Sequence, residues 1–463
     1  MTGNILRFDA GTLRLELGDI SDFPFELAGV FKYDPRTGNF RARACDYAQI
    51  VLTLKQKKFP FTDCARAYDN LKNLALKEKI TPHPHQQQAL EAWLANSGRG
   101  VVSLPTGSGK TILAVLAIAS LRRPALVLVP TIDLLTQWTT VLERFFGTPV
   151  GMLGGGSHDV QNLTVSTYDS AVLNIEFIGN RFGLLIADEC HHLPGAEYQL
   201  GAAMAIAPFR LGLSATPEMD EERTATLYEL LGKTVYSIGI DELEGKVLSN
   251  YQVKRMFVQL NSDEERLYRE HRAVYTGFLR RHGISFASRY GWRDFLIACS
   301  RFAGGKEAFA AFLEQRKIAR AGRAKLELLE NILLAHPGER IIIFTADNDT
   351  AYEIGRRFIF PVLTHHTRSA ERKAFLDAFR TGDYPVLVTS KVLNEGVDIP
   401  SAAVGVVFSG SGSVREHVQR LGRILRPSPG KSQAVLYELV SAGTSEEYTS
   451  GRRREHCAYR KRR

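Results

Sequence analysis

The 463-residue sequence is poor in cysteine and contains no long apolar run, and each absence excludes a class of protein. Its five cysteines are scattered and include no C-x-x-C pair, so they predict reduced thiols and neither a disulfide framework nor a zinc site. No apolar run approaches the roughly 20 residues that a membrane-spanning helix needs. The first residues also lack the basic and apolar regions of a signal peptide, so the sequence predicts a cytoplasmic protein without a membrane partner.

What the sequence does contain is an ordinary globular composition with an uneven distribution of charge. Hydrophobic residues make up 44% and charged residues 24%, which predicts folded domains, and the length suggests about three of them. The net charge is +9, and two segments hold the excess. Residues 261–325 contain 14 basic and 7 acidic residues, and residues 452–463 contain 7 basic and 1 acidic residue. Such patches favour a polyanionic partner, although a solvated basic surface would give the same pattern.

Short apolar strands alternate with helical stretches in two parts of the chain. The first part contains the runs at 100–105, 125–130, 163–167, 183–188 and 210–215, and the second contains those at 340–345, 384–390 and 403–410. Alternation of this kind is typical of a parallel sheet that helices cover on both faces. We therefore predict an α/β fold with two parallel-sheet domains, of which only the first has a glycine-rich loop.

Two other regions differ from these alternating units. Near the N-terminus, residues 13–17 alternate apolar and polar side chains, and residues 31–44 contain the turn residues of a hairpin. A helix is expected after Asp46, which has the spacing of a capping box with Gln49. Residues 261–325 place apolar and aromatic residues at helical spacing, which predicts a basic helical insertion between the two α/β domains.

A glycine-rich segment, LPTGSGKT at 104–111, lies between a predicted strand and a predicted helix. Backbone N–H groups of such a loop cradle phosphate oxygens, while Lys110 can reach the β- and γ-phosphates and Thr111 can hold Mg²⁺. Leu104 stands where the first glycine of the pattern belongs, and a chance G-K-T turn is the alternative. The residues expected to bind the nucleotide here are Leu104, Pro105, Thr106, Gly107, Ser108, Gly109, Lys110 and Thr111.

Two acidic residues, Asp188 and Glu189, end the apolar run that begins at residue 183. At the carboxyl end of a parallel strand, Asp188 would face the phosphate loop, where it can hold Mg²⁺. Glu189 would then orient or deprotonate the attacking water. An Asp-Glu pair after a strand is often a helix cap, and it is Lys110 that favours the catalytic interpretation.

A third motif, QRLGRILR at 419–426, places Arg423 and Arg426 on one face of a predicted helix. A guanidinium is most useful beside a departing γ-phosphate, where negative charge develops. Two arginines on a helix are otherwise usually solvated. With the phosphate loop present, we expect ATP to bind between the two α/β domains, with each domain supplying part of the catalytic set.

The three motifs, in this order, resemble the motor core of superfamily 2 helicases and translocases over residues 83–445. Segments such as STYDSA at 166–171, VLNEGVDIP at 392–400 and the run at 409–431 are most similar to the XPB family in its short archaeal-type form. The resemblance implies two RecA-like motor domains, ATP and Mg²⁺ as cofactors, and 3′-to-5′ movement on DNA at the nucleoid. It also implies a nuclease as a possible partner protein.

The same resemblance implies roles for individual residues. Gln86 would read adenine, with His85 stacking on the base, and Asp398 and Gln419 would complete the nucleotide site. The residues expected to contact nucleic acid are Pro130, Thr131, Ser166, Thr167 and Tyr168, with Arg280, Arg281, Arg289 and Trp292 of the helical insertion. Ser214, Ala215 and Thr216 would couple hydrolysis to strand binding. Met219, Asp220 and Glu221 occupy the place of an Arg-Glu-Asp trio for strand separation, and the missing arginine weakens that role.

These assignments divide the chain into five parts and leave three functions open. The parts are a damage-recognition-like DNA-binding domain (1–80), an ATP-binding domain (83–248), a thumb-like insertion (260–325), a second RecA-like domain (326–450) and a basic tail (451–463). We expect an ATP-driven DNA translocase or helicase that opens duplexes in DNA repair. An RNA helicase or restriction-type translocase on the same fold is one alternative, and a nucleotide-gated scaffold that opens DNA for a nuclease is the other.

Overall fold

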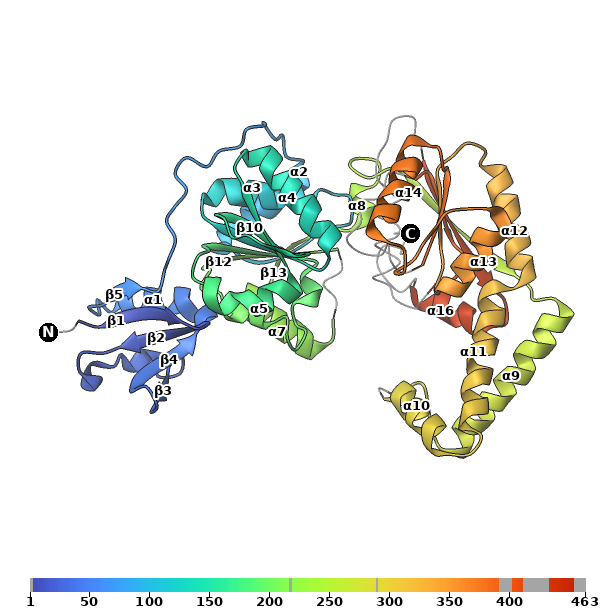
Figure 1. The fold of residues 1–463 in the computed structure, drawn as a ribbon, viewed down its shortest axis with the longest axis horizontal. Helices are drawn as coiled ribbons and strands as arrows, with labels where there is room; N and C mark the ends of the chain where they lie inside the picture. Colours follow the sequence, from blue (N-terminus) through green and yellow to red (C-terminus); the bar gives the residue numbers. More distant parts are fainter. Residues whose placement is uncertain (1–2, 216–218, 289, 391–401, 411–432, 454–463) are drawn as a thin grey trace. The chain divides into compact units, whose positions relative to one another are not determined.

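The computed structural model describes residues 3–215, 219–288, 290–390, 402–410 and 433–453. These residues fall into two compact units, one ending at Glu242 and the other beginning at Leu243. Each unit contains its own parallel sheet covered by helices (Figure 1). Over these described ranges, no helix is both long enough and apolar enough to cross a membrane.

The first unit begins with a small sheet that carries one helix. Its strands follow the order β3-β4-β2-β1-β5 and are antiparallel except for the pair β1 and β5. The elements are β1 (Ile5–Asp9), β2 (Thr12–Glu16), β3 (Lys32–Asp34), β4 (Asn39–Arg43), α1 (Tyr47–Gln56) and β5 (Thr62–Cys64). The predicted hairpin is confirmed as β3 and β4. The predicted capping box is wrong, because the Asp46 carboxylate pairs with Arg43 and makes no capping hydrogen bond to α1.

This small domain shares buried surface with the α/β domain that follows it. Ile206 of the α/β domain is fully buried in the core that also contains Leu6 and Leu15 of the small sheet. The Asn180 side chain donates to the Ala65 carbonyl at 3.1 Å, and the Asn180 carbonyl accepts from the Ala67 N–H at 3.0 Å. Apolar packing and backbone hydrogen bonds therefore hold the two domains of this unit together.

The first α/β domain contains an eight-stranded sheet in the order β13-β6-β12-β11-β7-β10-β8-β9. Its neighbouring strands are parallel except for the terminal pair β8 and β9. The strands are β6 (Arg99–Ser103), β7 (Ala125–Val129), β8 (Val150–Gly154), β9 (Ser157–His158), β10 (Leu163–Thr167), β11 (Leu184–Asp188), β12 (Phe209–Ser214) and β13 (Thr234–Ser237). The five strands predicted for this region are thus confirmed as β6, β7, β10, β11 and β12.

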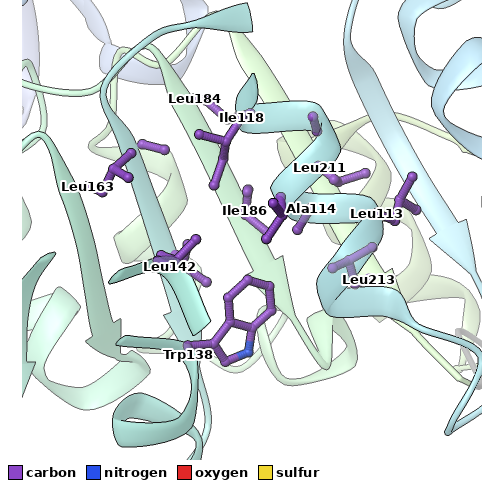
Figure 2. Close-up of a cluster of buried hydrophobic side chains, with 14 of the residues drawn as sticks. Leu113, Ala114, Ile118, Trp138, Leu142, Leu163, Leu184, Ile186, Leu211 and Leu213 are labelled. Carbon is purple, nitrogen blue, oxygen red and sulfur yellow. The ribbon is translucent and has the colours of Figure 1, made fainter. Parts of the chain in front are cut away.

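Helices cover both faces of this sheet. The first group is α2 (Pro84–Ala95), α3 (Lys110–Leu121) and α4 (Ile132–Phe146), and the second is α5 (Tyr168–Ile178), α6 (Leu200–Ala203) and α7 (Glu221–Leu231), with the short α8 (Ile240–Leu243) after β13. On the first face, Ala114 and Ile118 of α3 lie close to Ile186 of β11, within a buried cluster that also contains Leu113 (Figure 2). Burial of each large apolar side chain stabilises the fold by about 1.5–3 kcal/mol, which fixes the strand ends that carry the site.

The second unit contains a six-stranded sheet in the order β14-β19-β18-β15-β17-β16, with every neighbouring pair parallel. Its strands are β14 (Tyr251–Val258), β15 (Ile341–Phe344), β16 (Val362–Leu363), β17 (Val386–Thr389), β18 (Val404–Val407) and β19 (Ala434–Ser441). Its helices are α12 (Arg323–Ala335), α13 (Asn348–Phe358), α14 (Ser369–Thr381) and α16 (Ser445–Arg453). The predicted second parallel-sheet domain is therefore confirmed.

The basic segment between β14 and α12 is helical, as predicted. It forms α9 (Ser262–Arg281), α10 (Gly291–Arg301) and α11 (Gly305–Ala321), with α9 and α11 side by side (Figure 1). An aromatic cluster that includes Phe278, Phe295 and Phe312 joins the three helices. The insertion therefore has a small core of its own, and most of its charged side chains are exposed.

Candidate nucleotide site

The phosphate loop joins β6 to α3 at the carboxyl edge of the first sheet. Leu104 is fully buried in the apolar core, so its side chain anchors the start of the loop. Gly107 and Gly109 have φ angles of 86° and 88°, a region that favours glycine. A Cβ atom on Gly109 would also lie 2.2 Å from the amide nitrogen of Gln86. Both glycines are therefore required by the shape of the loop.

Two buried side chains of α2 hold this loop. Gln86 donates from Nε2 to the carbonyls of Ser108 and Gly109 at 3.1 and 3.3 Å. Its Oε1 accepts from the His83 N–H at 2.9 Å, which leaves the Gln86 amide bonded to protein rather than open to a base. His85 Nε2 lies 2.9 Å from the Ser108 carbonyl, and burial lowers the pKa of His85. The expectation that His85 stacks on adenine is not met, because its ring is buried against the loop.

The two acids at the end of β11 meet the lysine of the phosphate loop. Asp188 Oδ2 accepts from Trp138 Nε1 at 2.8 Å, and its Oδ1 accepts from the Glu189 N–H at 3.0 Å. Lys110 Nζ donates to Glu189 Oε1 at 3.1 Å. Neither carboxylate caps the 3₁₀ turn Cys190–His192 that follows, so the helix-cap interpretation is excluded.

Asp188 has an unusual pKa, and Glu189 has an unusual backbone conformation. Asp188 is 6% exposed, and burial together with the charge of Glu189 raises its pKa to about 6, against the opposing effects of Lys110 and Trp138. Glu189 has φ 45° and ψ 51°, a left-handed conformation that costs a non-glycine residue about 1–2 kcal/mol. A bound cation at this edge would favour the charged carboxylates, which burial disfavours.

A chain of contacts leads from Glu189 to the end of β12. His191 Nδ1 lies 3.6 Å from Glu189 Oε2 and 3.4 Å from Ser214 Oγ. The Ser214 carbonyl accepts from the Leu104 N–H at 2.9 Å. Ser214 therefore contacts both His191, which lies next to Glu189, and the first residue of the phosphate loop. A coupling role for Ser214 remains a prediction. Ala215 follows it, and Thr216 lies outside the described residues.

The available donors and acceptors fit a magnesium-bound triphosphate. Within the described ranges, the buried Thr106 Oγ1 has no hydrogen-bond partner. The loop adds backbone N–H groups and the Lys110 ammonium, which suit phosphate oxygens. Thr111 and Asp188 offer a hydroxyl and a carboxylate oxygen. Mg²⁺ usually takes one or two such protein ligands and completes its shell with phosphates and water.

Three of the residues expected to contact nucleic acid lie at helix starts. Thr131 caps α4, with its Oγ1 accepting from a backbone N–H at 3.3 Å, and Pro130 precedes it. Thr167 caps α5 in the same way, at 3.2 Å. Pro130 and Thr131 are partly exposed, and Thr167 is buried. A contact to nucleic acid at these turns remains a prediction.

The expectation for Ser166 and Tyr168 needs correction. Their side chains are 0% and 1% exposed, so neither reaches a strand on the surface. Ser166 Oγ donates to the Thr167 carbonyl at 2.9 Å. The Tyr168 hydroxyl donates to the Asp188 carbonyl at 2.9 Å. Tyr168 therefore supports the acidic residues from inside the domain.

The predicted contacts on the insertion are exposed where the structure describes them. Arg280 and Arg281 are exposed at the end of α9. Trp292 is 45% exposed, and its ring lies 5.2 Å from that of Phe312, so it is partly a packing residue. Arg289 lies outside the described residues.

The stretch expected to separate strands has local structural roles. Met219 packs against the apolar cluster on the second face of the sheet. Asp220 caps α7 by accepting from the Arg223 N–H at 2.9 Å, and Glu221 is the first residue of that helix. A wedge function for these three residues remains a prediction. The expected contributions of Asp398, Gln419, Arg423 and Arg426 fall outside the described residues.

Sequence reasoning missed two residues that touch the site, Trp138 and His191. Trp138 comes from α4 and is buried in the core shown in Figure 2, with its indole nitrogen reaching Asp188. No spacing rule links a tryptophan on a helix with an acid 50 positions away. His191 is adjacent to Glu189 in the sequence, and its position next to the acids was the one available signal.

Three family models match successive parts of the chain. Residues 6–65 match the Xeroderma pigmentosum group B helicase damage recognition domain, residues 79–219 match the type III restriction enzyme res subunit, and residues 324–428 match the helicase conserved C-terminal domain. The solved Hef helicase domain of Pyrococcus furiosus has the same fold, with a TM-score of 0.51 and 18% identity over 80% of this chain and 98% of that one.

Curated relatives extend the match over nearly the whole chain. The DNA 3′-5′ translocase XPB2 of Sulfurisphaera tokodaii is 38% identical over 92% of this chain and 95% of its own length. The DNA 3′-5′ helicase XPB of Mycobacterium tuberculosis is 29% identical over 80% of this chain, which spans 62% of that protein. A match of this extent, together with the specific N-terminal domain, means that the chain belongs to the XPB family of superfamily 2 DNA helicases and translocases.

Proposed function

We propose that this protein is an ATP-dependent DNA translocase or helicase of DNA repair that moves 3′ to 5′. The observation that carries the proposal is the meeting of Lys110, Asp188 and Glu189 beside a glycine-shaped phosphate loop. Membership of the family supports DNA as the substrate and ATP hydrolysis as the source of free energy. A phosphate loop with an acid pair serves the hydrolysis of a nucleoside triphosphate, and membership of the family favours ATP.

Each residue of the first domain has a definite task in this reaction. When bound, Mg²⁺ would neutralise the developing charge on the phosphate oxygens, with Thr111 and Asp188 as its protein ligands. Lys110 gives up its ion pair with Glu189 and donates to the triphosphate instead. Glu189, released from Lys110, accepts a proton from the attacking water or orients it. Glu189 is therefore paired with Lys110 when no nucleotide is bound, and it can act on water when the triphosphate is bound.

The second domain contributes residues that the resemblance assigns. Gln419, Arg423 and Arg426 would stabilise charge on the γ-phosphate, and Asp398 would contact the nucleotide. An arginine in this position accelerates phosphoryl transfer by about 10³–10⁵. Hydrolysis would then require both domains, and alternating affinity for the strand would become movement along it.

Backbone contacts account for DNA binding that tolerates any sequence. Exposed Arg280 and Arg281 on α9 supply positive charge, and Thr131 presents a helix start to a phosphate. Arg289 belongs to the same proposed surface. Trp292 would stack on a base with the part of its ring that Phe312 leaves exposed.

The test is ATP hydrolysis measured with duplex DNA, single-stranded DNA, RNA and no nucleic acid. We expect DNA to stimulate hydrolysis most strongly. Strongest stimulation by RNA would favour an RNA helicase on the same fold. Hydrolysis that ignores all three would contradict a nucleic-acid motor.

A second proposal concerns strand separation. Met219 replaces the arginine of the family's Arg-Glu-Asp trio and packs into the apolar cluster, so it offers no charge to a fork. We therefore expect the isolated chain to open duplexes weakly and to present DNA to a partner nuclease. A strand-displacement assay with and without a candidate nuclease tests this, and robust unwinding by the isolated chain would contradict it.

A further inference from the structure

Asp188 is held by side chains from two helices, and each helix begins at a turn expected to contact nucleic acid. Trp138 lies on α4, seven residues after its cap Thr131. Tyr168 is the first residue of α5, directly after its cap Thr167. Seven residues of α-helix correspond to about two rigid turns, so a displacement of the start of α4 is carried to Trp138.

The two hydrogen bonds hold different parts of the acidic pair. Trp138 Nε1 donates to the Asp188 carboxylate at 2.8 Å and so fixes that side chain. The Tyr168 hydroxyl donates to the Asp188 carbonyl at 2.9 Å and so fixes the peptide plane that leads into Glu189. Glu189 has a left-handed backbone outside any α-helix, so the orientation of that plane determines where its carboxylate points.

Burial makes these bonds hard to replace. Trp138, Tyr168 and Asp188 are all buried, so water has little access to substitute for a lost donor. Trp138 also lies in the packed core of the first face (Figure 2), and the Tyr168 ring contacts that of Tyr198 at 5.4 Å between centroids. Movement of either helix therefore has to move the acids or break a buried hydrogen bond.

We propose that Trp138 and Tyr168 are positioning residues through which nucleic acid bound at the starts of α4 and α5 changes the nucleotide site. The inference rests on the proposed DNA-motor function. Trp138 transmits to the Asp188 carboxylate, and Tyr168 transmits to Glu189. Because coupling between two ligands is reciprocal, the same bonds make nucleotide binding change the affinity for DNA.

The experiment compares two variants with two matched controls. Trp138→Phe and Tyr168→Phe each remove one donor to Asp188; Tyr168→Phe keeps the ring, and Trp138→Phe replaces the indole with a smaller phenyl ring. Trp93→Phe is the control for the first, because Trp93 is equally buried in the same core and its Nε1 donates to the Arg210 carbonyl at 2.9 Å. Tyr198→Phe is the control for the second, because the Tyr198 hydroxyl donates to Asp169 at 2.9 Å and not to Asp188.

The measurement is the affinity for the non-hydrolysable analogue AMP-PNP with magnesium, with and without saturating duplex DNA. The reciprocal affinity for DNA, with and without the analogue, is measured on the same samples. We expect the two ligands to tighten each other in the unaltered chain, the controls to keep that factor, and Trp138→Phe and Tyr168→Phe to reduce it by at least about fivefold. Circular dichroism establishes that each variant is folded, and if Trp138→Phe is not, Tyr168→Phe alone decides.

The outcomes separate this inference from the proposed function. Unchanged mutual tightening in both folded variants would overturn the inference, whatever happens to their hydrolysis rates. Two ligands that bind the unaltered chain without affecting each other would also overturn it and would leave nucleotide and DNA binding intact. An unaltered chain that binds neither ligand would overturn the proposed function itself.

Discussion

The two parallel sheets each carry an aspartate near the carboxyl edge, and the two aspartates have opposite surroundings. Asp188 ends β11, is 6% exposed, and has a pKa raised to about 6, chiefly by burial and the charge of Glu189. Asp347 follows β15, and its side chain is 33% exposed. It pairs with Arg320 at 2.9 Å and caps α13 by accepting from the Thr350 N–H at 2.9 Å. In its charged form, the Asp188 carboxylate therefore lowers the stability of the folded protein, whereas the Asp347 carboxylate raises it.

The difference shows that an aspartate at the carboxyl edge of a parallel sheet can either stabilise the fold or remain available for a ligand. In the second sheet, the aspartate has a cation and a helix start as partners, so its charge is satisfied by the protein. In the first sheet, the aspartate accepts from an indole N–H and a backbone N–H, but burial and the adjacent acid still raise its pKa, so a bound cation would favour its charged form. Sites that keep such unfavourable groups commonly trade stability for activity.

Replacing Lys110 in the first unit and Lys325 in the second should show the largest contrast, with a loss of activity in one variant and a loss of stability in the other. Lys110→Ala should abolish ATP hydrolysis and leave DNA binding and folding intact, because Lys110 pairs with Glu189 at the edge of the site. Lys325→Ala should destabilise the fold by about 3–5 kcal/mol, because Lys325 is buried and paired with Glu446. The hydrolysis rate and the free energy of unfolding are measured for both. Normal turnover by Lys110→Ala would contradict the role of the phosphate loop.

Glu189→Gln should lower the rate of hydrolysis by about 10²–10⁴, the usual contribution of general acid–base catalysis. Nucleotide binding should persist, because the glutamine removes only the charge that accepts the proton. The rate at saturating ATP and the affinity for AMP-PNP distinguish the two effects. A loss of affinity with an unchanged maximal rate would assign Glu189 to binding instead.

Neutralising the two aspartates should change stability in opposite directions. Asp188→Asn should remove a penalty of up to about 3 kcal/mol for the buried charge, since a pKa of about 6 in place of 3.8 disfavours the charged form. The net stabilisation of the nucleotide-free chain should be smaller by about 1 kcal/mol, because the amide NH₂ cannot accept one of the two hydrogen bonds that the carboxylate accepts. Asp347→Asn should destabilise it by about 1 kcal/mol through loss of its ion pair with Arg320. Denaturant unfolding at pH 8 measures both changes.

The pH dependence of Asp188→Asn follows from the direction of that pKa. A raised pKa means that the folded protein binds the proton more tightly than the unfolded chain. The penalty for the charged carboxylate is therefore fully present above pH 6 and disappears as the pH falls toward 4. The advantage of Asp188→Asn should follow the same curve. An advantage that is equal at pH 4 and pH 8 would contradict the burial argument.

The smallest effect concerns the basic regions outside both sheets. Removing residues 454–463 deletes five basic side chains and one acidic side chain and leaves α16 whole. DNA affinity should become less dependent on salt, with the slope falling by about 0.9 for each lost phosphate contact. Affinity measured at several salt concentrations gives the slope. An unchanged slope would mean that this segment does not touch phosphate.

The sequence predicted the strands of the sheets and the places of the glycine-rich loop and the acidic pair in the fold, because each depends on local order along the chain. Continuous apolar runs such as the one that ends at Asp188 mark buried parallel strands, and glycines before a lysine mark a phosphate loop. Both features can be identified from neighbouring residues alone, without knowledge of contacts between distant segments. The α/β fold and the helical insertion were predictable for the same reason.

The side-chain environments were less predictable, because they depend on packing between distant segments. Tyr168 was expected at a nucleic-acid surface, and it is buried with its hydroxyl on the Asp188 carbonyl. His85 was expected to stack on a base, and it is buried against the phosphate loop. Trp138 gave no signal at all, since an apolar helix position looks the same whether or not its N–H reaches an acid.

We propose that the first domain holds the triphosphate but does not cleave it unaided. Arg423→Ala in the full chain tests this most directly, with AMP-PNP affinity and DNA-stimulated ATP hydrolysis measured on the same sample. We predict unchanged affinity and a hydrolysis rate lowered by about 10³ or more. Hydrolysis at the rate of the unaltered chain would contradict the claim.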